Sequence, residues 1–347
     1  MPEATHCCQQ KKGSRLKINK LLLVSLVILT LTLSSYLFPV LLPWREILFK
    51  YFKSIWWAVA LGLLLGGLID HYVPREYISK ILSRKSPATI FNAVFLGFLM
   101  SACSHGILAL SIQLHKKGAS NPAVVSFLLA SPWANLAVSM MLISLFGVKG
   151  ILIVLAAMVI AVNTGFIFMF LEQMGLIESN RNTLEIPLAY SIRQDLYRRF
   201  KDYKFNQATL RRDIRGVVKG LIMLSQMVLW WILLGMLLAS LAGAFIPQHF
   251  FHKFMNATFW GLILTLALAT LIEVCSEGSS PLAFEIYRQS GGLGNSFTFL
   301  MAGVVTDYTE IGLLWSNVGR RVALMLPLVT VPQVLFLGWI FNLFIKK

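Results

Sequence analysis

Long apolar runs separated by short basic segments form the main pattern of this chain. The first run follows a polar, basic stretch over residues 1–20. A helix needs about 20 apolar residues to cross the hydrocarbon of a bilayer. The pattern therefore predicts an all-α, polytopic helical bundle in a membrane. Its expected helical runs are Leu21–Phe38, Ser54–Ile69, Ala88–Leu114, Asn121–Phe146, Gly150–Leu171, Val217–Phe245, Thr258–Ile286, Phe297–Trp315 and Val322–Ile345.

Composition supports an integral membrane protein and excludes a soluble globular one. Hydrophobic residues make up 57% of the chain and charged residues 13%, whereas soluble domains carry about 25% charged residues. The formal net charge is +16, but the cations lie in the N-terminal tail and in loops between apolar runs. This is the positive-inside pattern, and anionic lipid headgroups explain the charge. We expect no nucleic-acid partner.

A short polar motif occurs twice inside apolar runs. Residues 101–106 read SACSHG, and 172 positions later residues 273–278 read EVCSEG. An offset that stays unchanged without a gap predicts two homologous halves. The same offset pairs Phe127 with Phe299, Ala130 with Ala302, Asn135 with Asp307, Gly147 with Gly319, and Lys149 with Arg321.

The repeat and the charged segments divide the chain into five parts. Residues 54–171 and 217–347 are the two repeats. Residues 1–20 are expected to be a disordered cytoplasmic tail, and 21–53 an extra N-terminal transmembrane helix with a segment at the membrane interface. Residues 172–216 contain many arginines and lysines, and we interpret them as an amphipathic or partly helical cytoplasmic linker between the halves.

The charge distribution also bears on topology. If the run Ala88–Leu114 crosses the membrane once, the basic 172–216 loop lies outside, against the positive-inside rule. If the run turns back at its polar motif, loops 70–87, 115–120 and 172–216 all lie inside. The two halves then cross in opposite directions, as inverted repeats with broken or re-entrant helices. A parallel repeat of continuous spans is the alternative.

Two cysteines occupy equivalent positions in the two motifs, Cys103 and Cys275. A buried cysteine is often a small inert apolar residue, but here each has serine and glycine neighbours inside an apolar run. Contact with a thiophilic substrate and a tight turn are the functional interpretations. Cys7 and Cys8 in the tail fit a thiol sensor, a metal handle, an acylation site or no role. No paired zinc-binding spacing occurs, so no metal site or cofactor is expected.

Ionisable residues in the same motifs are candidates for proton transfer. His105 and Glu277 are equivalent positions that differ in charge type. Glu273 precedes Glu277 by four residues, so both share one face of a continuous helix. Two carboxylates this close raise at least one pKa and hold a proton. Intramembrane carboxylates usually face a cavity or a partner.

A third equivalent pair, Asn135 and Asp307, predicts a second helix break in each half. Glu310 lies three residues after Asp307, and Thr306 and Tyr308 add hydroxyl groups. A solvated loop is the alternative interpretation. If helices break here and face the first breaks, their termini present backbone dipoles to a bound ion or substrate.

At these motifs the chain resembles the ArsP/YraQ family of predicted permeases, whose characterised members export trivalent organoarsenicals. The resemblance covers about residues 50–345. It rests on SACS at 101–104, LLASP at 128–132 with Asn135, CSEGSSP at 275–281 and MAGVVTDYTE at 301–310. Family members often carry a second cysteine at the first motif, where this chain has His105.

The resemblance implies a permease of the bacterial inner membrane with a cytoplasmic N-terminus. It would export a small, thiophilic or organometalloid solute by alternating access driven by an ion gradient. The expected partners are this solute and the lipid bilayer, with a homo-oligomer left open. The expected substrate-binding residues are Cys103, Ser104, His105, Asn135, Cys275, Ser276, Thr306 and Tyr308, and the expected proton- or ion-coupling residues are Glu273, Glu277, Asp307 and Glu310.

Catalytic motifs of the G-x-S-x-G, H-E-x-x-H and Walker types do not occur in the sequence, so we expect no enzyme. Two other functions fit the pattern. One is a membrane thiol-redox enzyme in which Cys103 and Cys275 cycle as a pair. The other is a non-transporting membrane subunit that docks through the 172–216 loop.

Overall fold

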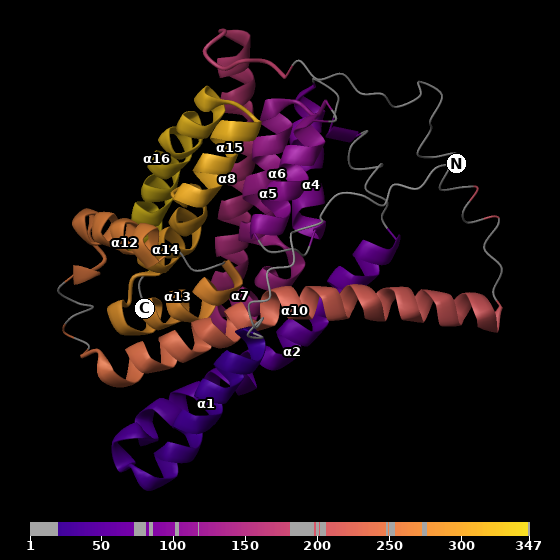
Figure 1. The fold of residues 1–347 in the computed structure, drawn as a ribbon. Coiled ribbons are helices and arrows are strands. Elements are labelled where there is room, and N and C mark those ends of the chain that lie inside the picture. The colour runs from indigo at the N-terminus through magenta and orange to yellow at the C-terminus, as the bar shows by residue number, and fades with distance from the viewer. Residues whose placement is uncertain are drawn as a thin grey trace.

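In the computed structural model, helices make up most of the part of the chain that it describes. Within that part there is no strand, and five helices, or six if a bent pair counts as one span, are long and apolar enough to cross a membrane. The prediction of an all-α multi-pass membrane protein is confirmed (Figure 1). The described residues are 20–72, 81–82, 86–100, 104–116, 118–180, 198, 201, 206–247, 249, 254–272 and 276–345.

The N-terminal part differs from the prediction in one respect. α1 spans Lys20–Leu37 and exposes most of its apolar side chains, as a lipid-facing helix does. The segment expected at the membrane interface is instead a short 3-10 turn, η1 (Pro39–Leu41), followed directly by α2 (Leu42–Tyr72). Its aromatic and apolar residues recur at helical spacing, and Trp44 and Tyr51 are buried. Tertiary packing of this face therefore extends the helix through the segment.

The remaining helices form two matching sets that are related by the 172-residue offset. The first set is α4 (Pro87–Leu99), α5 (Ser104–Lys116), α6 (Asn121–Ala134), α7 (Leu136–Phe146) and α8 (Val148–Gln173). The second is α12 (Phe259–Ile272), α13 (Ser276–Ser290), α14 (Leu293–Val305), α15 (Tyr308–Asn317) and α16 (Arg320–Phe344). Adding 172 to the first bounds gives the second within two residues at every end. α2 and α10 (Gln207–Phe245) precede the two sets.

Local sequence signals explain where several helices begin and end. Ser86 and Ser120 are extended residues before α4 and α6, and each of these helices has a proline in its first two positions. Proline suits the first turn of a helix because its missing N–H has no intrahelical partner there. Gly147 separates α7 from α8 with φ of 61°, a left-handed conformation that glycine adopts without steric cost.

Equivalent helices of the two halves pack on each other, and α8 packs against α16 in antiparallel fashion. The Nδ2 of Asn163 donates to the Oε1 of Gln333 over 2.8 Å. Just beyond the end of α8, the carbonyl oxygen of Gly175 accepts from the Nη1 of Arg321 over 3.3 Å. Numbering rises along α8 while it falls along α16, so the two helices run in opposite directions.

α2 and α10 are also equivalent in the repeat and also antiparallel. An added Cβ at Gly67 would lie 3.1 Å from the backbone nitrogen of Leu221. One turn later on α2, the ring of His71 lies against Gly216, where an added Cβ would be 2.3 Å from the ring. The two bare glycines let the helix axes approach closely. α6 also contacts its equivalent, α14. The contact of α7 with α13 has an equivalent in the contact of α15 with α5.

α10 is the longest helix described, with 39 residues, or about 58 Å at 1.5 Å per residue. Its apolar segment is Leu229–Phe245. The helix begins at Gln207, before the predicted span, and so takes in the end of the basic segment predicted as a linker. Figure 1 shows this N-terminal part extending away from α4–α8 (magenta) and α12–α16 (orange to yellow).

Candidate functional site

Each half contains two helix breaks, at the positions where the polar motifs predicted them. α4 ends at Leu99, and Met100 is extended, with φ of −81° and ψ of 106°. α6 and α7 meet at Asn135 with a bend of 40°. In the second half, α12 ends at Ile272 before α13, and α14 ends at Val305 before α15. Four short helices therefore begin inside the bundle and direct their N-termini toward these breaks.

The two breaks of each half lie next to each other. In the first half, the hydroxyl of Ser131 on α6 donates to the carbonyl oxygen of Met100 over 3.1 Å. In the second half, the hydroxyl oxygens of Thr270 on α12 and Thr306 are 2.8 Å apart. These contacts satisfy polar groups that helix ends leave unpaired. The second break thus faces the first in both halves.

The equivalent residues Asn135 and Asp307 make the same kind of hydrogen bond to the backbone. The Oδ1 of Asn135 accepts from the backbone N–H of Val138 over 2.8 Å, and the Oδ1 of Asp307 accepts from that of Glu310 over 3.2 Å. Each side chain therefore caps the helix that follows its break. In the second half the cap is also a carboxylate at the positive end of the α15 dipole.

Three of the predicted ion-coupling carboxylates are buried at helix N-termini. Glu277 in the first turn of α13 is 1% exposed, Glu310 in the first turn of α15 is 1% exposed, and Asp307 is 9% exposed. A buried carboxyl group is costly unless it is compensated. The second half therefore places three carboxyl groups at its breaks, where the first half has an amide at position 135.

The other predicted site residues lie in different environments. Thr306 donates to the carbonyl oxygen of Ala302 over 2.8 Å and meets Thr270. Tyr308 is 72% exposed, so its ring lies on the surface of the described structure. Ser104 and His105 open α5, and Ser276 opens α13. Cys7, Cys8, Cys103, Cys275 and Glu273 lie outside the described residues.

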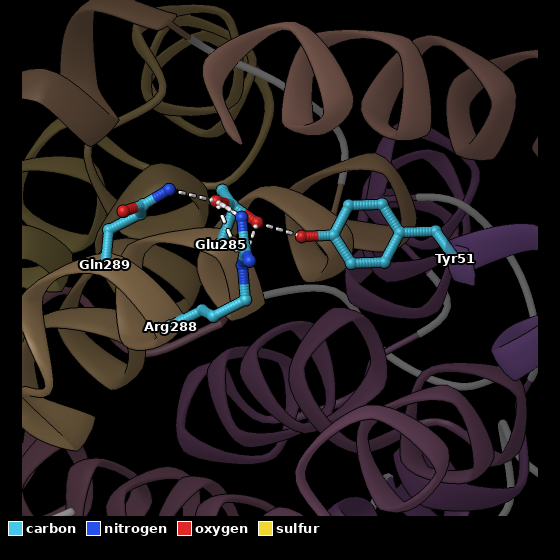
Figure 2. Close-up of polar contacts among 4 residues, drawn as sticks. All are labelled: Tyr51, Glu285, Arg288 and Gln289. Atoms are coloured by element: carbon cyan, nitrogen blue, oxygen red, sulfur yellow. Dashed lines mark hydrogen bonds and ion pairs between the residues drawn. The ribbon is translucent and has the colours of Figure 1, made fainter. Parts of the chain in front are cut away.

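The structure adds a polar cluster that sequence reasoning missed, shown in Figure 2. The carboxylate of Glu285 on α13 is fully buried. Arg288 on the same helix donates to it from Nε over 3.2 and 3.0 Å and from Nη2 over 2.7 Å. The Nε2 of Gln289 donates over 2.7 Å, and the hydroxyl of Tyr51 on α2 donates to Oε2. Gly243 on α10 lies against the carboxylate, where an added Cβ would be 2.6 Å from Oε1.

A sequence signal for this cluster existed. Glutamate and arginine three residues apart, at the end of an apolar run that holds the second motif, form a pair on one helix face. The repeat offset places Gln113 and Lys116 at the same positions of the first half. The carboxylate is thus present in one half only. Tyr51 lies far away in sequence, so only the fold identifies it.

A pocket lies elsewhere, at the end of the first half that leads into the 172–216 loop. It has a volume of about 310 Å³ and is formed by the starts of α4 and α6 and the end of α8. None of the described residues at the helix breaks lines it. Its lining residues are Ser86, Ile90, Ser120, Pro122, Met169, Glu172, Gln173 and Ser179.

The family of predicted permeases called ArsP_1 matches residues 46–343. The chain belongs to this family. The resemblance found at the repeated motifs is thereby confirmed. With its membrane-crossing helices, the chain is a multi-pass membrane permease.

Three curated relatives agree with this family. The chain is 19% identical to a Streptococcus mutans protein named "Putative two-component membrane permease complex subunit", over 73% of this chain and 79% of that one. It is 25% identical to "Putative permease Rv2963" of Mycobacterium tuberculosis, over 67% of this chain and 60% of that one. It is 20% identical to "UPF0718 protein YcgR" of Bacillus subtilis, over 77% and 86%. No solved structure matches the chain.

The capping role of Asn135 predicts a measurable loss of stability. Asn135→Ala removes the acceptor for the Val138 N–H and should lower the free energy of unfolding by about 1 kcal/mol. Asn135→Ser keeps a side-chain oxygen at the cap and should retain most of the stability. Thermal unfolding of both variants in the same detergent checks this. An alanine variant as stable as the serine variant contradicts the cap.

Proposed function

We propose that this permease moves a small, soft solute by alternating access between two halves that cross the membrane in opposite directions. The observation that carries the proposal is the antiparallel packing of equivalent helices, α2 with α10 and α8 with α16. An approximate two-fold axis that relates antiparallel partners runs perpendicular to them. For helices that cross a membrane, such an axis lies in the membrane plane, as in transporters built from inverted repeats.

The four helix breaks form the substrate site in this proposal. Irregular backbone at membrane depth is stable where it lines a cavity or is buried in protein, and half-helix N-termini attract anionic groups. The motif cysteines Cys103 and Cys275 directly precede α5 and α13 in the sequence. Thiolates are soft ligands, so they suit a thiophilic or organometalloid solute. Export across a bacterial inner membrane, with the N-terminus in the cytoplasm, completes the proposal.

Glu277, Asp307 and Glu310 are the proposed proton carriers, because they are buried carboxylates at the breaks. Energy then comes from an ion gradient. Asp307 has a neutral counterpart in the first half, Asn135. Glu277 and Glu310 have glutamine as a neutral isostere. Asn135 already caps α7 as Asp307 caps α15, so an amide at position 307 can preserve the helix start while it removes the charge.

Transport in sealed liposomes with an imposed proton gradient tests the coupling. Asp307→Asn and Glu277→Gln are expected to lose gradient-driven uptake of a trivalent organoarsenical by at least about tenfold, while thermal stability changes little. Glu46→Gln on α2 serves as the control, because it removes an exposed carboxylate outside the four helix breaks. Full proton-coupled transport in both acidic-residue variants ends the relay hypothesis.

Two further results bear on the substrate and on the alternatives. Cys103→Ser with Cys275→Ser should abolish resistance of cells to soft-metal compounds, and retained resistance ends the thiol hypothesis.

The Streptococcus mutans relative is named as a subunit of a two-component complex, so a partner subunit is the second candidate function. Transport by the purified chain alone excludes a purely accessory role.

A further inference from the structure

When α2 is counted with the first half and its equivalent α10 with the second, polar contacts between the two halves gather in two layers along α2. In the first layer the hydroxyl of Tyr51 donates to Glu285 on α13. In the second, the hydroxyl of Tyr72 donates to the Oδ2 of Asp213 on α10 over 3.4 Å. Tyr51 and Tyr72 are 21 residues apart, or about 32 Å along the helix axis. This separation matches the thickness of the bilayer hydrocarbon.

The helix break of the second motif lies between the two layers, as α10 shows. Asp213, near the start of α10, belongs to one layer. Gly243, near its end, lies against Glu285 in the other. Between them Gly235 touches the backbone of Gly278, in the first turn of α13. A solute at this break therefore has one polar layer on each side.

The two layers share one design. Each uses a carboxylate of the second half that keeps a cation on its own helix. Glu285 is paired with Arg288 within α13, where Nη2 and Oε1 are 2.7 Å apart. Asp213 lies 3.8 Å from the Nε of its neighbour Arg212 on α10. In each layer, an α2 tyrosine hydroxyl donates to this carboxylate, and one further side chain of the first half makes a polar contact beside it.

This design lets a layer separate without leaving a buried charge alone. Removing one partner of a buried ion pair is strongly unfavourable. When Tyr51 moves away, however, Glu285 keeps its bonds to Arg288 and Gln289 (Figure 2). The cost of losing the tyrosine contact is then about that of one hydrogen bond to a charged group. Such a contact is strong enough to bias a conformational equilibrium and weak enough to break in each cycle.

Neighbouring contacts strengthen each layer. Beside Tyr51, its ring packs edge-on against Phe284 with centroids 6.1 Å apart, and Lys149 on α8 donates to the hydroxyl of Tyr287 over 2.6 Å. Beside Tyr72, the Nε2 of His71 lies 3.4 Å from the Oδ1 of Asp213. Both layers therefore bring first-half side chains onto a helix of the second half.

The layers are not symmetric copies of one another. The repeat offset takes Tyr51 to Met223 and Glu285 to Gln113, neither of which can reproduce the bond between a hydroxyl and a carboxylate. The two layers therefore consist of different residues. Each end can therefore be tested separately.

We propose that the Tyr51–Glu285 and Tyr72–Asp213 contacts are the two gates of the transport pathway, one on each side of the helix breaks. This inference rests on the proposed alternating-access function. Loss of the Tyr51 hydroxyl opens the pathway on the side away from the 172–216 loop. Loss of the Tyr72 hydroxyl opens it on the loop side, because Tyr72 ends α2 at the segment that precedes α4.

A pair of matched substitutions on one helix tests this proposal. Tyr51→Phe and Tyr72→Phe each delete a single hydroxyl and keep the ring. The exposed Tyr36 on α1 supplies the control, Tyr36→Phe. The reporter is Ser280→Cys on α13, a fully buried position, with the four native cysteines replaced by serine. A membrane-impermeant maleimide is applied to right-side-out and inside-out vesicles.

We expect Tyr51→Phe to increase labelling of the reporter about tenfold from the side away from the 172–216 loop. Tyr72→Phe should increase it about as much from the loop side, and Tyr36→Phe should leave it unchanged. Increased labelling from the same side in both variants, or no increase in either, overturns the proposal. Size-exclusion profiles and thermal melts must match the parent, so that unfolding is not mistaken for opening.

Transport by the unmodified chain separates the two hypotheses, because the reporter lacks Cys103 and Cys275. Opposite-sided labelling in a chain that moves no solute in liposomes refutes the proposed transport and supports the gates as conformational contacts. Unchanged labelling in an active transporter refutes the gates alone.

Discussion

Gly235→Ala is expected to prevent the normal packing of α10 on α13. A Cβ at this position would lie 2.0 Å from the carbonyl oxygen of Gly278 and 2.7 Å from its Cα. The obstructing atoms are backbone, so no side chain can move aside. Overpacking of a core costs about 1–3 kcal/mol, and a clash with backbone lies at or above the upper end. The yield of monodisperse protein in detergent and its melting temperature should both fall.

Gly312→Ala is the matched control for this substitution. Gly312 lies within α15, and an added Cβ meets no atom within 4 Å. Alanine is favoured over glycine inside a helix by about 1 kcal/mol, so this variant should melt at or above the temperature of the parent protein. If Gly235→Ala melts like Gly312→Ala, the close approach of α10 to the repeated motif is wrong.

Glu285→Ala is expected to produce the second large loss of stability. It removes the acceptor of Arg288, Gln289 and Tyr51 together. Breaking a buried ion pair from one side costs about 3–5 kcal/mol. Arg288 is 39% exposed and recovers part of its hydration, so about 2–3 kcal/mol is expected here. Unfolding of the detergent-solubilised protein, followed by heat or denaturant, measures it.

Two companion variants identify the cause of that loss. Glu285→Gln keeps an acceptor for Tyr51 and should lose less stability than Glu285→Ala. The double variant Glu285→Ala, Arg288→Ala removes the unpaired cation as well, so it should recover part of the loss. Arg288→Ala alone gives the effect of that substitution on the parent protein. If the double variant is less stable than Glu285→Ala by the same amount, the two side chains do not interact.

The amino-acid sequence determined the helices, their repeat and their breaks. Apolar runs at membrane length predicted the α-helical bundle, and the offset of 172 predicted the matching bounds of α4–α8 and α12–α16. The breaks at Asn135 and Asp307 were also predictable. Helix formation depends on hydrogen bonds four residues apart and on capping by near neighbours, so local sequence contains most of the required information.

The local pattern was less informative where packing overrides it. Residues 39–53 contain cations and aromatic rings suited to a membrane interface, yet they form η1 and the first turns of α2. Trp44 is fully buried there. The linker was predicted to be amphipathic or partly helical, and α10 includes its residues 207–216. At residues 42–53 the helix continues because one of its faces, with Trp44 and Tyr51, is buried, which hydropathy does not reveal.

Only the tertiary structure decided which residues of the two halves meet. Tyr51 and Glu285 are separated by 234 positions, and neither belongs to the repeated motif. Their contact depends on the relative placement of α2, α10 and α13, which arises from close approaches at bare glycines such as Gly235 and Gly243. Such placement is a property of whole helix surfaces, where ridges and gaps must fit. The sequence therefore determined the two broken-helix repeats, and the packing between them decided the contacts that join the halves.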